Sequence, residues 1–242
     1  MMKRKVYLLF DACDTLCYLD YERLSNFLKR HKIETEIEKL MRRAFEVNYK
    51  IDMYLKEGRK LWHGDFIRGY FREYLKTFTI NEDEVNSLID GIAAEDKRLS
   101  LWSSTFDGVK NTLSILKAKG YHMSVISNSD GRVSGILKKI GLNEFMEKIY
   151  DSYVVGMEKP NPRIFDMAIS DLNLSRSRTL FIGDLFYLDV LGANKSGIPA
   201  VHIDHCDLYK GWPGIRINNV AELPDLLETL DLSSPDLFPF KN

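Results

Sequence analysis

Short apolar runs of strand length recur along this chain and alternate with helix-like stretches through its second half. The runs are VYLLF (6–10), YHMSVIS (121–127), IYDSYVV (149–155), TLFIG (179–183) and PAVHI (199–203). Helical patterns separate them, one over about residues 107–119 before Gly120 and another opened by Pro162. Strands and helices that alternate at this spacing predict an α/β fold, a parallel-sheet Rossmann-like core with helices on both faces.

A helical block interrupts this pattern after the first strand. Helix-period apolar faces replace strand-like runs there, with start signals at Thr35 and Glu38 and at Asn81 and Glu84. We therefore predict a separate bundle of about four helices over residues 17–102, inserted into a core made of residues 1–16 and 103–242. The stretch after residue 230 is expected to be a loosely held tail.

The composition excludes several classes of function. The formal charge is −1, from 34 basic and 35 acidic side chains, so no bulk field draws the chain to nucleic acid or to a membrane surface. The first apolar run is too short for a signal peptide, and three cysteines do not resemble a disulfide framework. We expect a reduced, cytoplasmic protein, and the sequence leaves its oligomeric state open.

Reactive side chains follow the predicted strands, at the edge where an open parallel sheet binds its ligands. In chain order these residues are Asp11, Cys13, Asp14, Thr15, Ser127, Asn128, Lys159, Asp184 and Asp189. Oxygen ligands from Asp11 and Asp184 suit Mg²⁺, which prefers one or two carboxylates together with waters and a phosphate. Ser127 and Lys159 would hold phosphate oxygens, and an ionised aspartate facing phosphorus can act as a nucleophile.

Four segments in order, FDACDTL, VISN, EKPNPRIF and FIGDLFYLDVLGANKSGIPAVHI, resemble the motifs of the haloacid dehalogenase superfamily of hydrolases, many of which carry an all-helical cap after the first strand. The resemblance covers nearly the whole chain. It implies a Mg²⁺-dependent hydrolase, most simply a phosphatase that acts on a small phosphorylated metabolite through an aspartyl-phosphate, under a cap that excludes water.

The resemblance also implies roles for individual residues. Asp11 would be the nucleophile and a metal ligand, Thr15 would position the phosphoryl group, and Lys159 would neutralise charge. Phosphate binding falls to Ser127, Asn128 and Cys13. Metal binding falls to Asp11, Asp184, Asp189 and the backbone carbonyl of Cys13, with Asp189 contacting a metal-bound water or pairing with Lys159.

Cys13 departs from the phosphatase pattern, which places a second aspartate two residues after the nucleophile. That aspartate protonates the leaving group and then helps to deprotonate water. General acid–base help is typically worth about 10²–10⁴-fold, and a thiol is a weak hydrogen-bond donor. We therefore expect good leaving groups, such as acyl or aryl phosphates, to be favoured, and breakdown of the aspartyl-phosphate to be slow.

Three other interpretations stay open on the sequence. A 2-haloacid dehalogenase uses the same nucleophile without a metal, and Arg42 would then bind the substrate carboxylate. A catalytically weak member would bind a phosphorylated metabolite or a protein. A zinc site from Cys13, Cys17, His202, His205 and Cys206 is disfavoured because the ligand pairs are spaced too widely. Many aromatic residues in the helical block, Trp62 and His63 among them, are expected to form its core or to line a substrate cavity.

Overall fold

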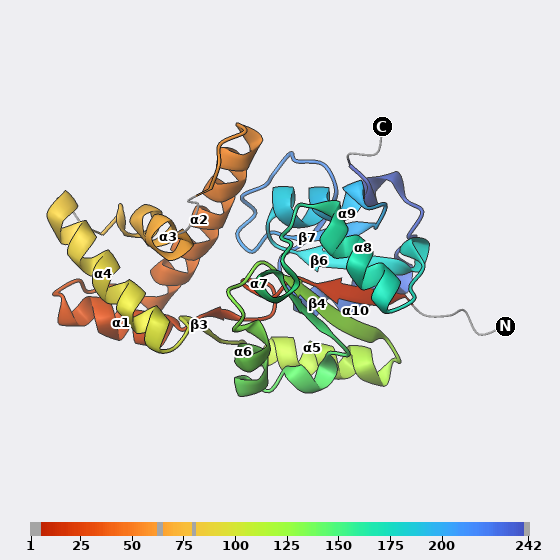
Figure 1. The fold of residues 1–242 in the computed structure, drawn as a ribbon, viewed down its shortest axis with the longest axis horizontal. Coiled ribbons are helices and arrows are strands. Elements are labelled where there is room, and N and C mark those ends of the chain that lie inside the picture. Colours follow the sequence, from red (N-terminus) through yellow and green to blue (C-terminus); the bar gives the residue numbers. More distant parts are fainter. Residues whose placement is uncertain (1–5, 62–64, 79–80, 240–242) are drawn as a thin grey trace. The chain divides into compact units, whose positions relative to one another are not determined.

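A computed structural model describes residues 6–61, 65–78 and 81–239 (Figure 1). The chain divides into two compact units. Residues 1–18 and 105–242 form one, called here the sheet unit, and residues 19–104 form the other, the helical unit. The predicted boundaries lie two residues earlier at each junction.

The sheet unit is built on a six-stranded parallel sheet, which confirms the predicted α/β class. Its strand order is β5-β4-β1-β6-β7-β8. The strands are β1 (Tyr7–Phe10), β4 (His122–Ser127), β5 (Ile149–Asp151), β6 (Thr179–Gly183), β7 (Ala200–Ile203) and β8 (Ile215–Ile217). Strand β8 was not predicted, because this edge strand has only three residues and is half exposed, so it lacks the apolar run of its neighbours.

Strand β1 lies at the centre of the sheet, between β4 and β6. Leu8, Leu9 and Phe10 are fully buried, as expected for a strand covered on both faces. From β1 the chain order runs outward through β4 and β5 on one side and through β6, β7 and β8 on the other. Right-handed crossovers therefore place the connecting helices on opposite faces, and ligands bind at the carboxyl ends of strands where the direction reverses.

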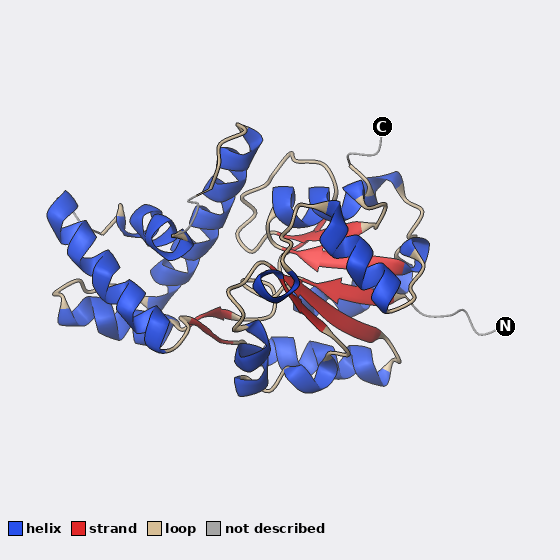
Figure 2. Ribbon diagram, in the orientation of Figure 1, coloured by secondary structure: helices blue, strands red, loops and turns tan. Residues whose placement is uncertain are grey.

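Helices cover both faces of this sheet (Figure 2). They are α5 (Asp107–Ala118), α6 (Val133–Lys139), α7 (Ser152–Val155), α8 (Pro162–Asp171), α9 (Leu191–Lys195) and α10 (Leu223–Thr229). Helix α5 packs with α10, and α8 packs with α9. Asn161 caps α8 ahead of Pro162, so the predicted start of that helix is confirmed.

Two predictions for this unit are wrong. The run 149–155 is a strand only as far as Asp151, whose carboxylate accepts the backbone N–H of Tyr153 and starts α7. The described part of the C-terminal segment is not loosely held. Leu237 is fully buried, and the Asn194 amide donates to its carbonyl at 2.9 Å.

The helical unit contains α1 (Tyr21–Arg30), α2 (Ile37–Lys56), α3 (Phe66–Leu75) and α4 (Glu82–Arg98). The predicted helical bundle is therefore present. Asn81 caps α4 as expected, whereas the start signal at Thr35 is wrong, because α2 begins at Ile37 after Glu36, which makes no side-chain cap. The segments that lead into and out of the bundle pair as short strands β2 (Tyr18–Leu19) and β3 (Trp102–Ser104), which were not predicted.

Aromatic side chains form much of the core of the helical unit. Tyr70, Phe71 and Tyr74 of α3 are buried, and Trp102 packs against the first two. Trp62 and His63 lie outside the described residues. None of the described helices has the length and apolar character needed to span a lipid bilayer.

Candidate active site

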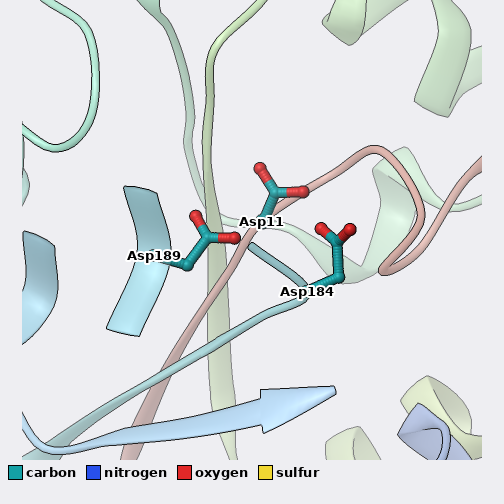
Figure 3. A group of neighbouring side chains, drawn as sticks. All are labelled: Asp11, Asp184 and Asp189. Carbon is teal, nitrogen blue, oxygen red and sulfur yellow. The ribbon is translucent and has the colours of Figure 1, made fainter. Parts of the chain in front are cut away.

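Three buried carboxylates converge at the carboxyl edge of the central strands (Figure 3). Asp11 directly follows β1 and Asp184 directly follows β6, while Asp189 lies in the π-helical turn Phe186–Val190 that comes next. One ligand oxygen of each lies within 4.8 Å of the others. The topology therefore brings together three of the residues that sequence analysis assigned to a metal.

Lys159 provides the positive charge that faces this cluster. Its buried Nζ donates to Oδ1 of Asp11 and, at 2.6 Å, to Oδ1 of Asp189. Burial alone would lower the pKa of Lys159, but the charges of Asp11 and Asp189 outweigh it and raise the pKa, so the ammonium stays protonated. Lys159 is thus ion-paired with the residue predicted to be the nucleophile.

Asn128 positions Lys159. Its side-chain oxygen accepts the backbone N–H of Lys159 at 2.7 Å, and its side-chain nitrogen donates to the Lys159 carbonyl at 2.9 Å. Both ends of the Asn128 amide thus bind the backbone of Lys159, and phosphate binding by Asn128 stays a prediction. The adjacent Ser127 remains a candidate for the phosphate.

Asp189 also acts on Lys159. One carboxylate oxygen accepts from Lys159, and the other accepts the backbone N–H of Leu185 at 2.9 Å. The carboxylate lies directly against Gly183, where any side chain would overlap Oδ2 of Asp189. Of the two roles open to Asp189 on the sequence, the structure contains the pairing with Lys159.

This close approach leads to a prediction for Gly183→Ala. The added methyl group must displace the Asp189 carboxylate, and Lys159 would then lose one of its two anchors. We expect kcat/KM for release of phosphate from p-nitrophenyl phosphate to fall about tenfold, the lower end of the loss seen when a residue that orients a catalytic group is changed. The control is Gly108→Ala, where a Cβ meets nothing within 4 Å. Equal kcat/KM for Gly183→Ala and wild type would contradict this prediction.

The site has more negative than positive charge. Burial raises the pKa of Asp11 to about 7, with Lys159 opposing the shift and Asp189 adding to it. Burial, followed by the charge of Asp11, also raises the pKa of Asp184. Three buried carboxylates facing one ammonium leave negative charge that a divalent cation would balance. The donor set is all oxygen, so these residues fit Mg²⁺.

Two buried hydroxyls add to this fit. Thr15 Oγ1 and Ser127 Oγ are fully buried, and within the described residues neither has a protein hydrogen-bond partner. Buried hydroxyls without partners are costly unless a water or a ligand satisfies them. Thr15 lies in the loop after β1 and Ser127 is the last residue of β4, and both were predicted to contact the phosphate.

Cys13 lies in a tight loop after the predicted nucleophile. The backbone N–H groups of Leu16 and Cys17 both donate to the Ala12 carbonyl at 2.8 Å, and Asp14 has a left-handed φ of 55°. Interaction with the Cys17 thiol, together with burial, raises the pKa of the Cys13 thiol. A neutral thiol therefore stands at the position where the phosphatase pattern predicts a carboxylic acid.

No zinc site forms from the cysteines and histidines within the described ranges. The carboxylate trio is the group of His, Cys, Asp and Glu side chains spaced to share a metal there. His202 Nε2 instead contacts the Asp184 carbonyl at 2.7 Å, and burial lowers the pKa of His202 to about 4. On the sequence, His202 was a candidate only for zinc. Its place two strands from the nucleophile was the signal for its proximity to the site.

The family model described as "Haloacid dehalogenase-like hydrolase" matches residues 34–203, most of this chain. The chain belongs to the haloacid dehalogenase-like hydrolase family. The glyceraldehyde 3-phosphate phosphatase of Pyrococcus furiosus is similar over almost its whole length. It is 29% identical over 239 residues, and the alignment covers 95% of both chains.

Solved structures of the family share the fold. A HAD-hydrolase of Bacillus subtilis with bound magnesium is 21% identical, with a TM-score of 0.64, over 93% of this chain and 100% of that one. A 2-haloacid dehalogenase of Pseudomonas syringae is 22% identical, with a TM-score of 0.56, over 93% of this chain and 99% of that one. Phosphatase and dehalogenase chemistry therefore have to be separated by the site rather than by the fold.

Proposed function

We propose that this hydrolase is a Mg²⁺-dependent phosphatase that acts on a small phosphorylated metabolite through an aspartyl-phosphate on Asp11. The observation that carries the proposal is the buried trio of Asp11, Asp184 and Asp189 facing a single lysine. Such a cluster repels an anionic substrate unless a cation is bound with it.

Asp11, Asp184 and the backbone carbonyl of Cys13 would hold the Mg²⁺, which supplies positive charge against the phosphate and the carboxylates when bound. A free carboxylate oxygen of Asp11 attacks phosphorus, and the bond from phosphorus to the leaving oxygen breaks. Lys159 lowers the pKa of Asp11 against the effect of burial and orients its carboxylate. The hydroxyls of Thr15 and Ser127 donate to phosphate oxygens, which satisfies both buried groups. A water oxygen then attacks phosphorus, the bond from phosphorus to the Asp11 oxygen breaks, and inorganic phosphate leaves while the Asp11 carboxylate is regenerated.

The relative from Pyrococcus furiosus supports a three-carbon phosphate such as glyceraldehyde 3-phosphate as a candidate substrate. This substrate is an alkyl phosphate, whose leaving oxygen needs a proton. Because Cys13 stands where the acid is expected, we propose that the chain turns over acetyl phosphate or p-nitrophenyl phosphate faster than glyceraldehyde 3-phosphate.

Dehalogenation remains the second candidate, because Cys13 removes the phosphatase acid. The buried Asp184 counts against dehalogenation, since that chemistry needs no metal-binding carboxylate. Arg42, the predicted carboxylate-binding residue, lies exposed on α2 and pairs with Glu46 at 3.1 Å. Arg43 beside it donates to the carbonyls of Glu73 and Tyr74 within the helical unit.

The test is release of inorganic phosphate with and without EDTA. We expect turnover of p-nitrophenyl phosphate to vanish on chelation and to return with added Mg²⁺. The parallel assay measures halide release from 2-chloropropionate. Metal-independent halide release without phosphatase activity would replace the proposed function with dehalogenation.

A further inference from the structure

Two histidines of one segment contact the two loops that carry the acids: His202 lies within β7, and His205 lies two residues after the end of that strand. His202 is buried within β7, beside β6, and its Nε2 lies 2.7 Å from the backbone carbonyl of Asp184. Because a carbonyl can only accept, Nε2 carries the hydrogen and donates it. The bond therefore holds the peptide of the metal-binding aspartate rather than its carboxylate.

Aromatic side chains keep the His202 ring in this orientation. Tyr209 meets it edge to face with ring centroids 4.3 Å apart, and Phe186 does so at 5.5 Å. Phe186 begins the turn that also contains Asp189. A ring enclosed in this way cannot rotate without disturbing its neighbours, so the donor stays directed at the loop after β6.

His205 makes the same kind of contact with the other loop. Its Nε2 lies 2.6 Å from the carbonyl of Asp14, the residue with left-handed backbone in the loop after β1. Tyr18 packs edge to face with this ring at 5.6 Å. The Asp11 loop and the Asp184 loop are thus each tethered, through one carbonyl, to the same segment, residues 202–205.

We propose that His202 and His205 are positioning residues that hold the Asp184 and Asp11 loops in the arrangement required to bind Mg²⁺. The inference rests on the proposed function and deepens it. Lys159 bridges Asp11 and Asp189, but three carboxylates facing one ammonium still repel one another, which favours separation of the loops. Tethering both carbonyls keeps the carboxylates together and lowers the cost of ordering them when Mg²⁺ binds.

The test compares His202→Leu and His202→Gln by isothermal titration with Mg²⁺ alone. Leucine removes the donor, and glutamine keeps an amide N–H in a similar place. We expect the dissociation constant for Mg²⁺ to rise about tenfold in His202→Leu, the scale of losses at residues that orient metal ligands, and to stay within about threefold of wild type in His202→Gln. At saturating Mg²⁺ the kcat of His202→Leu should approach the wild-type value.

Asn194→Ala is the matched control. Asn194 is a buried side chain that donates to two backbone carbonyls of the same unit, those of Ile198 and Leu237, and neither belongs to the acidic loops. We expect this variant to lose thermal stability while its Mg²⁺ affinity stays unchanged. An equal loss of Mg²⁺ affinity in Asn194→Ala and His202→Leu would mean that His202 has only a general structural role, and it would overturn the inference.

Other outcomes separate this inference from the proposed function. Unchanged Mg²⁺ affinity in His202→Leu, with a lowered melting temperature only, overturns the inference and leaves the function intact. Wild type that binds Mg²⁺ but hydrolyses no phosphate rejects the function and leaves the inference intact. Wild type that does not bind Mg²⁺ rejects both. If His202→Leu does not fold, the same titration of His205→Leu decides, with weaker Mg²⁺ binding expected.

Discussion

Asp11→Asn is expected to lower phosphatase turnover by roughly 10⁴-fold or more, the order of loss that follows removal of a catalytic nucleophile. Asparagine keeps the size of the side chain and one acceptor oxygen, but an amide does not form the aspartyl-phosphate. The neighbouring acids and Lys159 stay in place, so the fold should persist. Steady-state release of phosphate from p-nitrophenyl phosphate measures the effect.

A second measurement on the same pair of proteins tests the intermediate. Wild type quenched in acid during turnover should gain the mass of one phosphoryl group on the peptide that contains Asp11, and Asp11→Asn should not. Asp96→Asn, at a buried carboxylate of the helical unit that accepts the backbone N–H of Leu101 at 2.8 Å, controls for the loss of a buried charge. Comparable activity in Asp11→Asn and wild type would remove Asp11 from the chemistry. Phosphorylation without turnover would favour a catalytically weak member of the family.

Cys13→Asp is expected to increase turnover of an alkyl phosphate such as glyceraldehyde 3-phosphate by about 10²-fold or more, since general acid–base help contributes about 10²–10⁴-fold. An aspartic acid protonates the leaving oxygen, which the neutral Cys13 thiol does poorly. Turnover of p-nitrophenyl phosphate should rise less, because nitrophenolate leaves without a proton. The informative quantity is the ratio of kcat/KM between the two substrates.

Cys13→Asn is the matched control for that substitution. It has the shape of aspartate without an acidic proton, so we expect no gain on either substrate. A similar gain in Cys13→Asn would attribute the effect to the shape of the loop. A loss of activity in Cys13→Asp on both substrates would mean that this enzyme needs no carboxylic acid at position 13. Its substrates would then have leaving groups that depart as stable anions without a proton.

Residues that act through their position after a strand were predictable, whereas residues that act through contacts across the fold were not. Asp11, Asp184 and Lys159 lie at the edge where strand and helix alternation placed them, because strand order and direction follow from the pattern. Asn128 was assigned to phosphate through the resemblance of VISN to a family motif, and nothing in the sequence indicated that its amide pairs with the Lys159 backbone. The strand that carries His202 indicated proximity to the site, but nothing in the sequence indicated that His202 and His205 contact two carbonyls from distant loops.

Errors in the secondary structure have a similar cause. The strand predicted over 149–155 ends early because one side chain, Asp151, caps a helical turn and stops the ladder. The C-terminal segment looked polar and rich in turn residues, yet the single residue Leu237 anchors it in the core. Local composition describes a segment on average, and one buried side chain or one cap is enough to override it.

The position of β1 also determines how this chain must fold. Leu8 pairs with Met123 and Leu180, both more than 100 residues away along the chain. Such long separations slow folding, because loop closure has to precede the contacts that reward it. During synthesis the strand that leads to Asp11 emerges before the helical unit, whereas its neighbours β4 and β6 emerge after that unit, so β1 remains an unpaired apolar segment meanwhile. Substitutions that delay folding of the helical unit should therefore reduce the yield of soluble enzyme, even where they leave the chemistry of the assembled site unchanged.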